Sequence, residues 1–337
     1  MKLSIIIVNH RGWKSLKRCL ESLRDLRALS FTWEVIVVDN DSGGDQLQQF
    51  IRQFPEFYFL GNSGNNGFAN GCNFGAKNSS GEFMLFLNPD TIVTVEAISR
   101  LVHVAERHPE YTILSCSQVT DTGKDDRPYG LFLRPATLTS FLRTLYKLTH
   151  KRLEPVTLEP DISVIFPDWV SGSVMLMHRN WFQHLQWDED YWMYFEDMDI
   201  CRRVRKQGGQ VALLKNTQII HNHGGASRIN RFVKALTKSE VMISRHVYIQ
   251  KHFRGITRVL MHGYFVMNNI FFAPLLAAIV GMLLFFKPSF STYPRLYLNI
   301  VRYYAAALTG RTWLSHRSPN YKKTVPGAYQ PAKAEAA

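Results

Sequence analysis

The chain has 337 residues, 46% of them apolar, and its 40 lysines and arginines exceed its 27 aspartates and glutamates to give a net charge of +13. This length and apolar share can bury a sizeable core, so we expect one large domain with an appendage. The charge indicates an anionic partner, such as nucleic acid, a phosphate-bearing substrate or an acidic membrane surface. The four cysteines are widely spaced without a C-x-x-C pair, which argues against a disulfide framework and a zinc site and favours reduced thiols in a cytosolic chain. Lys2 leads straight into an apolar run, and this N-terminus lacks the features of a signal peptide.

Apolar, strand-like runs alternate with helical patterns along the first two thirds of the chain. Strands are predicted at 3–8, 33–38, 57–60, 83–87, 169–177 and 211–214, with an extended run at 218–221. Helices are predicted at 14–26, 46–53 and 95–107, with a further helix start within 62–75. This alternation predicts an α/β fold with a right-handed, mostly parallel central sheet. The segment from about 120 to 165 is irregular and rich in Pro, Arg and Lys. We interpret it as a variable insertion that borders the site of the acceptor substrate.

Polar side chains follow three of these strands. Asn9, Asp39 and Asp90 each lie at the carboxyl end of a strand-like run, and in an open α/β sheet ligands bind beyond those ends. Asp39 could accept hydrogen bonds from a pyrimidine N–H or a ribose hydroxyl. Asp90 could ligate a divalent ion that bridges a diphosphate, and a histidine such as His221 could complete the metal shell. The alternative for Asn88-Pro89-Asp90 is a plain turn, because these are turn residues.

Two further segments carry small or metal-ligating residues. The segment 65–75 holds Asn66, Gly67 and Asn73, amides and small residues of the kind that line a nucleotide at a helix start. The chain has neither G-x-G-x-x-G directly after the first strand nor a P-loop motif, which argues against a dinucleotide cofactor. His221 and His223 lie two positions apart before Gly224-Gly225, which favours a ligand loop there.

An acidic cluster lies among aromatic and apolar residues. Glu196, Asp197 and Asp199 occupy three of four consecutive positions. Burying an unpaired charge is costly, so these acids need partners or a chemical role. A general base requires a carboxylate in a partly dry cleft, where burial tunes its pKa. The alternative is an ordinary amphipathic helix start, with the acids at the positive end of the helix dipole and Arg202 and Arg203 later.

The C-terminal part contains a long apolar run. Residues 259–286 include no Asp, Glu, Lys or Arg, and these 28 residues are long enough to span a bilayer. Asn268, Asn269 and Pro274 interrupt the run, and both flanks are basic, which contradicts a simple single span. We therefore expect a re-entrant hairpin or an interfacial helix with both flanks on the cytoplasmic face. The alternative is a pair of buried core helices.

Taken in order, these features resemble the family 2 inverting glycosyltransferases, which have a nucleotide-sugar-binding α/β fold of the GT-A type. The resemblance covers about residues 3–225. It rests on residues 4–9, 35–40, 66–68 with 73–75, 87–91 and 194–199. The usual Asp-x-Asp metal motif of the family is Asn88-Pro89-Asp90 here, a departure also typical of a rhamnosyltransferase-like branch of bacterial polysaccharide synthesis. Residues 168–176 look similar to the same branch.

The resemblance implies a single displacement in which Asp197 is the general base, while a Mg²⁺ or Mn²⁺ ion on Asp90 and His221 stabilises the leaving nucleotide diphosphate. It implies that the nucleotide-sugar is bound by Asn9, Asp39, Asn66, Gly67, Asn73 and Asp90. It implies that the acceptor is contacted or oriented by Trp169, Gly172, Glu196 and Asp199, with Asp199 paired to Arg202 or Arg203. The implied donor is dTDP-L-rhamnose, and the implied acceptor is a polyprenyl-diphosphate-linked saccharide in O-antigen or cell-surface polysaccharide synthesis.

We expect a GT-A domain at 1–225, a helical connector at 226–258, a hydrophobic and basic membrane-associating region at 259–310 and a flexible tail at 311–337. The basic residues concentrate around the apolar run, which favours an anionic membrane surface, the cytoplasmic face of the inner membrane, over nucleic acid. Two alternatives stay open. The same fold could use UDP-galactofuranose or a UDP-hexose, or the chain could be a catalytically inactive, membrane-associated binding protein.

Overall fold

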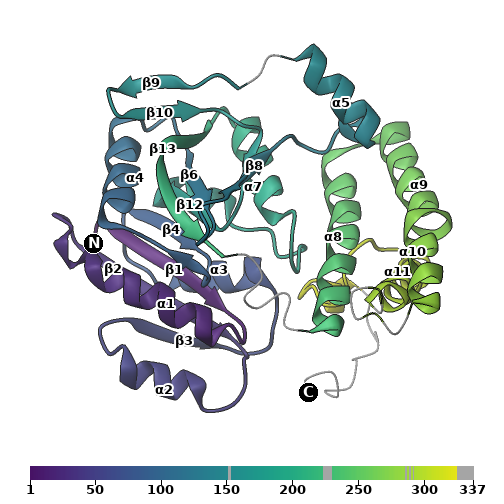
Figure 1. The fold of residues 1–337 in the computed structure, drawn as a ribbon, viewed down its shortest axis with the longest axis horizontal. Helices are drawn as coiled ribbons and strands as arrows, with labels where there is room; N and C mark the ends of the chain where they lie inside the picture. The colour runs from purple at the N-terminus through teal and green to yellow at the C-terminus, as the bar shows by residue number, and fades with distance from the viewer. Residues whose placement is uncertain (151–152, 223–229, 285–286, 288–289, 291, 325–337) are drawn as a thin grey trace. The chain divides into compact units, whose positions relative to one another are not determined.

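The computed structural model describes residues 1–150, 153–222, 230–284, 287, 290 and 292–324. The chain divides into two compact units, which Figure 1 shows as ribbons. The N-terminal unit comprises Met1–Asp188 and Phe195–Val233, and the C-terminal unit comprises Glu189–Tyr194 and Lys234–Ala337. The chain therefore returns to the N-terminal unit directly before the acidic cluster at 196–199.

Strands and helices alternate in the N-terminal unit. Its strands are β1 (Leu3–Asn9), β2 (Trp33–Asn40), β3 (Tyr58–Asn62), β4 (Phe83–Leu87), β5 (Thr91–Ile92), β6 (Ile113–Val119), β7 (Asp125–Asp126), β8 (Tyr129–Gly130), β9 (Val156–Glu159), β10 (Ile162–Ile165), β11 (Trp169–Val170), β12 (Val174–His178) and β13 (Val211–His221). Its helices are α1 (Trp13–Arg24), the 3₁₀ turn η1 (Asp25–Ala28), α2 (Gln46–Gln53), α3 (Phe68–Lys77), α4 (Val95–Arg107), the 3₁₀ turn η2 (Pro135–Thr137), α5 (Ser140–Thr149), α6 (Arg179–Leu185) and α7 (Glu196–Lys206).

The N-terminal unit is built on one large sheet with the strand order β3-β2-β1-β4-β12-β6-β13-β10-β9. Strands β3, β2, β1 and β4 run parallel, and β6 pairs in parallel with β13. Strand β12 lies antiparallel between β4 and β6. Asn9 lies opposite Asp39 in the β1–β2 register, so the polar residues at these carboxyl ends meet.

Helices cover both faces of the sheet (Figure 1). On one face, Ile5 and Ile7 of β1 belong to the buried apolar cluster that includes side chains of α1 and α4. On the other face, α3 approaches β1 closely, since a Cβ at Gly75 would lie 2.6 Å from Ile6 Cγ2. Strands buried on both faces explain why their sequences are continuously apolar.

The predicted α/β class is confirmed, and the elements predicted at 46–53, 83–87 and 95–107 have those bounds. The single strand predicted at 169–177 is wrong, because β11 and β12 are separate strands that belong to different sheets. The runs at 211–214 and 218–221 instead form one strand, β13, with a register shift between Leu214 and Gln218. The segment from 120 to 165 is more regular than expected, since it contains β7, β8, α5, β9 and β10.

The described part of the C-terminal unit is helical. Its helices are α8 (Arg231–His252), which begins three residues before this unit, α9 (Gly255–Phe271), α10 (Ala273–Leu283), α11 (Thr292–Gly310) and α12 (Tyr321–Thr324). Phe272, with φ −119° and ψ −122°, separates α9 from α10. The stretch Gly255–Leu283 is nevertheless the one part of the described chain that is long and apolar enough to cross a membrane, and 24% of its most apolar window is buried.

Polar contacts tie α9 to α8 and α11 within the C-terminal unit. His246 of α8 contacts the Tyr304 hydroxyl through Nε2 at 2.8 Å and His262 of α9 through Nδ1 at 2.8 Å. Asn269 donates to the same Tyr304 hydroxyl at 2.9 Å. The polar side of α9 is thus covered by its neighbours, while large apolar side chains on α9 and α10 stay exposed, among them Leu260 at 64%.

Candidate active site

The carboxyl ends of β1 and β2 hold two of the predicted site residues. Asn9 is fully buried and donates through Nδ2 to Asp39 Oδ1 at 3.3 Å, while its Oδ1 accepts from the Gly12 N–H at 3.1 Å. Asp39 also accepts hydrogen bonds from the Ser42 hydroxyl and, at 3.2 Å, from the Ser42 N–H. Asn9 therefore holds Asp39 in place, and Asp39, at 6% exposed, keeps a small opening to solvent.

The start of α3 borders these strand ends. Gly67 precedes the helix with a φ of +95°, a conformation that favours glycine. Its carbonyl accepts a hydrogen bond from Asn40 Nδ2 at 2.8 Å, which ties α3 to the end of β2. Asn66 is partly exposed and donates to the Ser63 carbonyl at 3.1 Å. A helix start in this position favours an anionic group such as a phosphate.

Asn73 lies in the middle of α3 and contacts the protein itself. Its Nδ2 donates to the Trp187 carbonyl at 2.9 Å, and its Oδ1 accepts from the Trp187 N–H at 3.0 Å. The Trp187 ring packs edge-on against Phe68, with 5.6 Å between centroids. Asn73 thus holds Trp187, and with it Phe68 at the start of α3, in place.

Asp90 and His221 lie next to each other. Asp90 follows β4, His221 ends β13, and His221 Nε2 lies 3.2 Å from Asp90 Oδ1. The other ring nitrogen, Nδ1, lies 2.8 Å from Gln118 Oε1 and 3.6 Å from Asp126 Oδ2. His221 is 2% exposed, so these contacts fix its orientation. His223 falls outside the described residues.

The contacts of His221 suit a cation between this ring and Asp90. Oxygens lie on both sides of the ring, with Gln118 Oε1 and Asp126 Oδ2 beside Nδ1 and Asp90 Oδ1 beside Nε2. An imidazole that donates from Nδ1 presents the lone pair of Nε2 toward Asp90, where a cation can bind both groups. One carboxylate and one imidazole fit Mg²⁺ or Mn²⁺ when phosphate oxygens and water complete the shell. Among the described residues no group of three or more His, Cys, Asp and Glu side chains is arranged to hold an ion, so a bound diphosphate would have to supply ligands.

Asp197 lies at the start of α7, where the backbone takes an unusual path. Tyr194 and Phe195 have φ values of +69° and +68°, and this left-handed conformation is strained for bulky residues. After this turn Asp197 Oδ1 accepts from the Met198 N–H at 2.7 Å, and Oδ2 accepts from the Gly172 N–H at 3.3 Å. Backbone donors on both oxygens hold the carboxylate in one orientation.

The two neighbouring carboxyls Glu196 and Asp197 differ in acidity. Burial raises the pKa of Asp197 to about 6, and its backbone hydrogen bonds limit the rise. Burial, together with the charge of Asp197, raises the pKa of Glu196 well above its ordinary value. Glu196 is 7% exposed, and its Oε2 has no hydrogen-bond partner within the described chain. Asp197 is therefore the more acidic member of the pair.

Asp199 has a structural partner. Its Oδ2 accepts from Arg203 Nε at 2.6 Å, one of the two pairings that the sequence analysis gave. Arg203 also donates to the Gln186 carbonyl at 2.8 Å. Asp199 is 1% exposed, so the ion pair within α7 lies away from solvent, and the Arg203 hydrogen bond to Gln186 joins α7 to the segment after α6.

Trp169 and Gly172 lie on the segment that faces Asp197. A Cβ at Gly172 would lie 3.3 Å from Phe68 Cε1 and 3.7 Å from Asp197 Cβ, so a side chain here would press against the Phe68 ring. The Trp169 indole N–H donates to the Leu131 carbonyl at 3.1 Å, and β11 pairs with β8. Trp169 thus holds this segment to the loop at 131.

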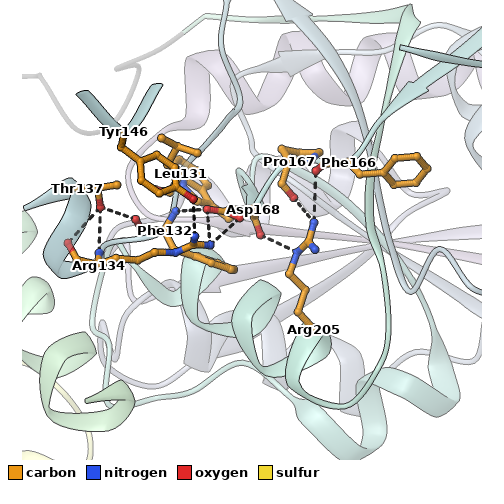
Figure 2. Close-up of polar contacts among 10 residues, drawn as sticks. Leu131, Phe132, Arg134, Thr137, Tyr146, Phe166, Pro167, Asp168 and Arg205 are labelled. Atoms are coloured by element: carbon orange, nitrogen blue, oxygen red, sulfur yellow. Dashed lines mark hydrogen bonds and ion pairs between the residues drawn. The ribbon is translucent and has the colours of Figure 1, made fainter. Parts of the chain in front are cut away.

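An ion pair supports the same segment from behind, as Figure 2 shows. Both carboxylate oxygens of Asp168 accept from Arg134 Nη2, at 2.8 and 2.9 Å. Arg134 Nη1 also donates to the Tyr146 hydroxyl of α5 at 2.8 Å. From the other side, Arg205 donates to the Pro167 carbonyl at 2.6 Å. The segment that leads to Gly172 is therefore held by α5 and by α7.

The pair Gly172-Ser173 joins the two halves of the site. Gly172 N–H binds Asp197, while Ser173 Oγ donates to Gln118 Oε1 at 3.0 Å, the same oxygen that faces His221. Sequence reasoning identified Gly172 but missed Ser173 and Gln118. Neither residue type is distinctive, and only the pairing of β12 with β6 places them together.

Comparisons with known proteins identify a related family. Residues 4–163 match the family described as Glycosyl transferase family 2. The match includes Asn9, Asp39 and Asp90, and it ends before Gly172, Asp197 and His221.

Two curated relatives are similar over about two thirds of the chain. The low-salt glycan biosynthesis hexosyltransferase Agl10 of Haloferax volcanii is 27% identical over 65% of this chain and 67% of its own length. The rhamnosyltransferase WbbL of Escherichia coli is 24% identical over 64% of this chain and 82% of its own length. Among solved structures, the crystal structure of S. aureus TarS 1-349 is 15% identical with a TM-score of 0.47, covering 98% of this chain and 93% of that chain.

Proposed function

This chain contains a glycosyl transferase family 2 domain, and from that premise we propose that it transfers one sugar from a nucleotide-sugar donor to an acceptor hydroxyl with inversion. The observation that carries the proposal is the Asp197 carboxylate. It is held by the N–H groups of Met198 and Gly172 at 2.7 and 3.3 Å. It lies beside Gly172, and burial raises its pKa to about 6.

In the proposed reaction Asp197 takes the proton of the acceptor hydroxyl as that oxygen attacks the anomeric carbon. A base is most effective when its pKa lies near the working pH, and Asp197, with a pKa of about 6, is the more acidic of the two neighbouring carboxyls. Asp39 and the start of α3 at Gly67 receive the nucleotide and its phosphates. Asp199 remains paired with Arg203 and keeps α7 in place.

Asp90 and His221 would hold a Mg²⁺ or Mn²⁺ ion in this proposal. When bound, such an ion neutralises the charge that develops on the leaving diphosphate. The support for it is the 3.2 Å approach of His221 Nε2 to Asp90 Oδ1. Gln118 and Asp126 orient the imidazole from its other nitrogen, as groups behind metal-binding histidines commonly do.

For the donor we propose dTDP-L-rhamnose, so that inversion gives an α-L-rhamnoside. The support is the resemblance of the Asn88-Pro89-Asp90 and 168–176 segments to the rhamnosyltransferase-like branch, together with the rhamnosyltransferase WbbL among the relatives. UDP-galactofuranose or a UDP-hexose is the alternative, and a hexosyltransferase is also among the relatives.

For the acceptor we propose a polyprenyl-diphosphate-linked saccharide at the cytoplasmic face of the inner membrane, used in O-antigen or cell-surface polysaccharide synthesis. The support is the exposed apolar surface of α9 and α10, where Leu260, Leu276 and Leu283 are 64%, 64% and 71% exposed. Because buried polar contacts join α9 to α8 and α11, this surface suits a helix group that lies in the interface, with basic flanks toward anionic lipid.

A donor panel tests the proposal. The purified chain is incubated with dTDP-L-rhamnose, UDP-galactofuranose or UDP-glucose, with and without a polyprenyl-linked acceptor fraction, and nucleotide diphosphate release is measured. We expect acceptor-dependent release from dTDP-L-rhamnose. If nucleotide diphosphate is released from only one of the other donors, that donor would replace dTDP-L-rhamnose in the proposal. If calorimetry shows donor binding but no nucleotide diphosphate is released, the catalytically inactive binding protein would be favoured.

A further inference from the structure

Helix α5 of the N-terminal unit presents an apolar stripe that the described part of the protein leaves uncovered. Phe141, Leu145 and Leu148 are 76%, 48% and 79% exposed. Their spacing of four and three residues places them on one side of the helix. No residue of α5 is buried.

Helix α5 is short and has little apolar packing to stabilise it in water. It has 10 residues, and isolated helices shorter than about 12–15 residues are marginal. Its polar anchors include the Thr139 cap, which accepts from the Leu142 N–H at 3.0 Å, and Arg134, which donates to the Tyr146 hydroxyl and lies over its ring. Neither anchor covers the stripe, so we expect α5 to gain packing from an external partner.

The charge around α5 indicates what that partner is. Both charged residues of α5, Arg143 and Lys147, are basic. A helix with an apolar side and only cationic charges is typical of helices that lie on an anionic membrane surface. Each lysine or arginine near such a surface adds about 1 kcal/mol of attraction.

We propose that α5 is a membrane-docking element of the catalytic unit, with Phe141, Leu145 and Leu148 inserted into an anionic lipid leaflet. This inference deepens the proposed function and rests on it for the lipid-borne acceptor. It adds a second lipid contact, outside the apolar run at 259–286.

The contacts of Figure 2 connect this docking element to the site. Tyr146 of α5 accepts from Arg134, and Arg134 binds Asp168 through both carboxylate oxygens. Asp168 directly precedes β11, and the segment continues to Gly172, whose N–H binds Asp197. Docking of α5 would therefore set the distance between the segment 168–172 and the lipid surface.

Site-specific fluorescence on the full chain tests the docking. All four native cysteines are buried, so a cysteine introduced by Phe141→Cys or Leu148→Cys can be labelled selectively with an environment-sensitive dye. Matched controls are Arg143→Cys, which helical spacing places on the opposite side of α5, and Gln49→Cys, an exposed position of α2. The probe is a vesicle of phosphatidylethanolamine with phosphatidylglycerol, compared with pure phosphatidylcholine.

We expect a blue shift of the dye at 141 and 148 with the anionic vesicles, a much smaller shift at 143 and none at 49. The shift should weaken in 1 M salt, because salt screens the attraction. Unchanged dye emission at 141 while the protein cosediments with the vesicles would overturn the proposal. Blue emission without vesicles that disappears on dilution would also overturn it and assign the stripe to a second copy of the chain.

The fluorescence readout needs no catalysis, so it stands if the donor or acceptor proposal fails. Activity then supplies a second readout. The double variant Phe141→Ser with Leu148→Ser should transfer sugar to a short soluble acceptor at the wild-type rate. Transfer to the lipid-linked acceptor in vesicles should fall about tenfold, which corresponds to about 1.4 kcal/mol. An equal loss with both acceptors would contradict docking and indicate a role in folding.

Discussion

Gly172 and Asp197 are 25 positions apart in the chain and meet through a hydrogen bond from the Gly172 N–H to Asp197 Oδ2 at 3.3 Å. The next residue, Ser173, donates to Gln118 beside His221. One short segment between β11 and β12 thus contacts both the proposed base and the residues behind the proposed metal site. A change in this segment should affect proton transfer and diphosphate binding together.

The pH dependence of transfer should show one acidic limb. Asp197 has a pKa of about 6, and it acts as a base only when ionised. The value of kcat/KM should therefore rise tenfold per pH unit well below pH 6 and level off above it. A rate that is constant between pH 4.5 and 7.5 would exclude Asp197 as the base.

Glu196→Gln should stabilise the protein at high pH. The pKa of Glu196 is raised in the folded state, so above the unfolded pKa of about 4.3 the unfolded chain ionises first and stability falls. Glutamine removes this loss. Chemical denaturation should show a gain in the free energy of unfolding at pH 8 and no gain at pH 4. Destabilisation at both pH values would mean that the Glu196 carboxyl has a required partner.

Gln118→Ala should weaken metal binding without removing a ligand. Gln118 orients His221 through its Oε1 at 2.8 Å, and loss of such a group typically costs about 10–100-fold in metal affinity. Mn²⁺ binding in the presence of dTDP is measured by calorimetry, with Gln49→Ala on the surface of α2 as the control. Asp90→Ala should weaken binding further, because it removes the charged oxygen ligand. Equal Mn²⁺ affinity in the wild type and all three variants would contradict the assignment of the metal site to Asp90 and His221.

Charges placed on the apolar surface of the C-terminal unit should release the chain from membranes. Leu276 and Leu283 are 64% and 71% exposed, so Leu276→Glu with Leu283→Glu should leave the fold intact and oppose insertion. The double variant should move from the membrane pellet to the supernatant. Gln48→Glu with Gln49→Glu adds the same charge on α2 and should leave the distribution unchanged. If the leucine variant stays in the membrane pellet, a segment that spans the bilayer, or a different membrane contact of the chain, would be favoured.

Much of the fold could be predicted because local signals agreed with the tertiary structure. The continuous apolar runs of β1, β2 and β4 reflect burial on both faces, and the periodicity of α4 gave its bounds. The break at residues 171–173 was missed because Val170 and Val174 are both buried strand residues, and only their different partners separate them. Helix α5 was missed because none of its residues is buried, so its apolar residues do not pack against a core as those of α4 do.

The site was partly predictable for a similar reason. Asp39, Asp90 and Asp197 are recognisable because carboxylates at strand and helix ends are unusual among apolar neighbours. Asn9 and Asn73 are amides whose partners, Asp39 and Trp187, are known only from the register and the packing. Gln118 and Ser173 gave no sequence signal, since their roles depend on the pairing of β12 with β6.

The assignment of Asp197 as the base is tested most directly with wild type and Asp197→Asn. Sugar transfer and, by calorimetry, donor binding are measured in the same preparation of each protein. Asparagine keeps the shape and its side-chain oxygen can still accept a backbone hydrogen bond, but it cannot take the proton. We predict that the rate of transfer falls by about two to four orders of magnitude while the donor Kd stays within about twofold, a difference of about 0.4 kcal/mol. Transfer at the wild-type rate by the pure variant would contradict the assignment of Asp197 as the base.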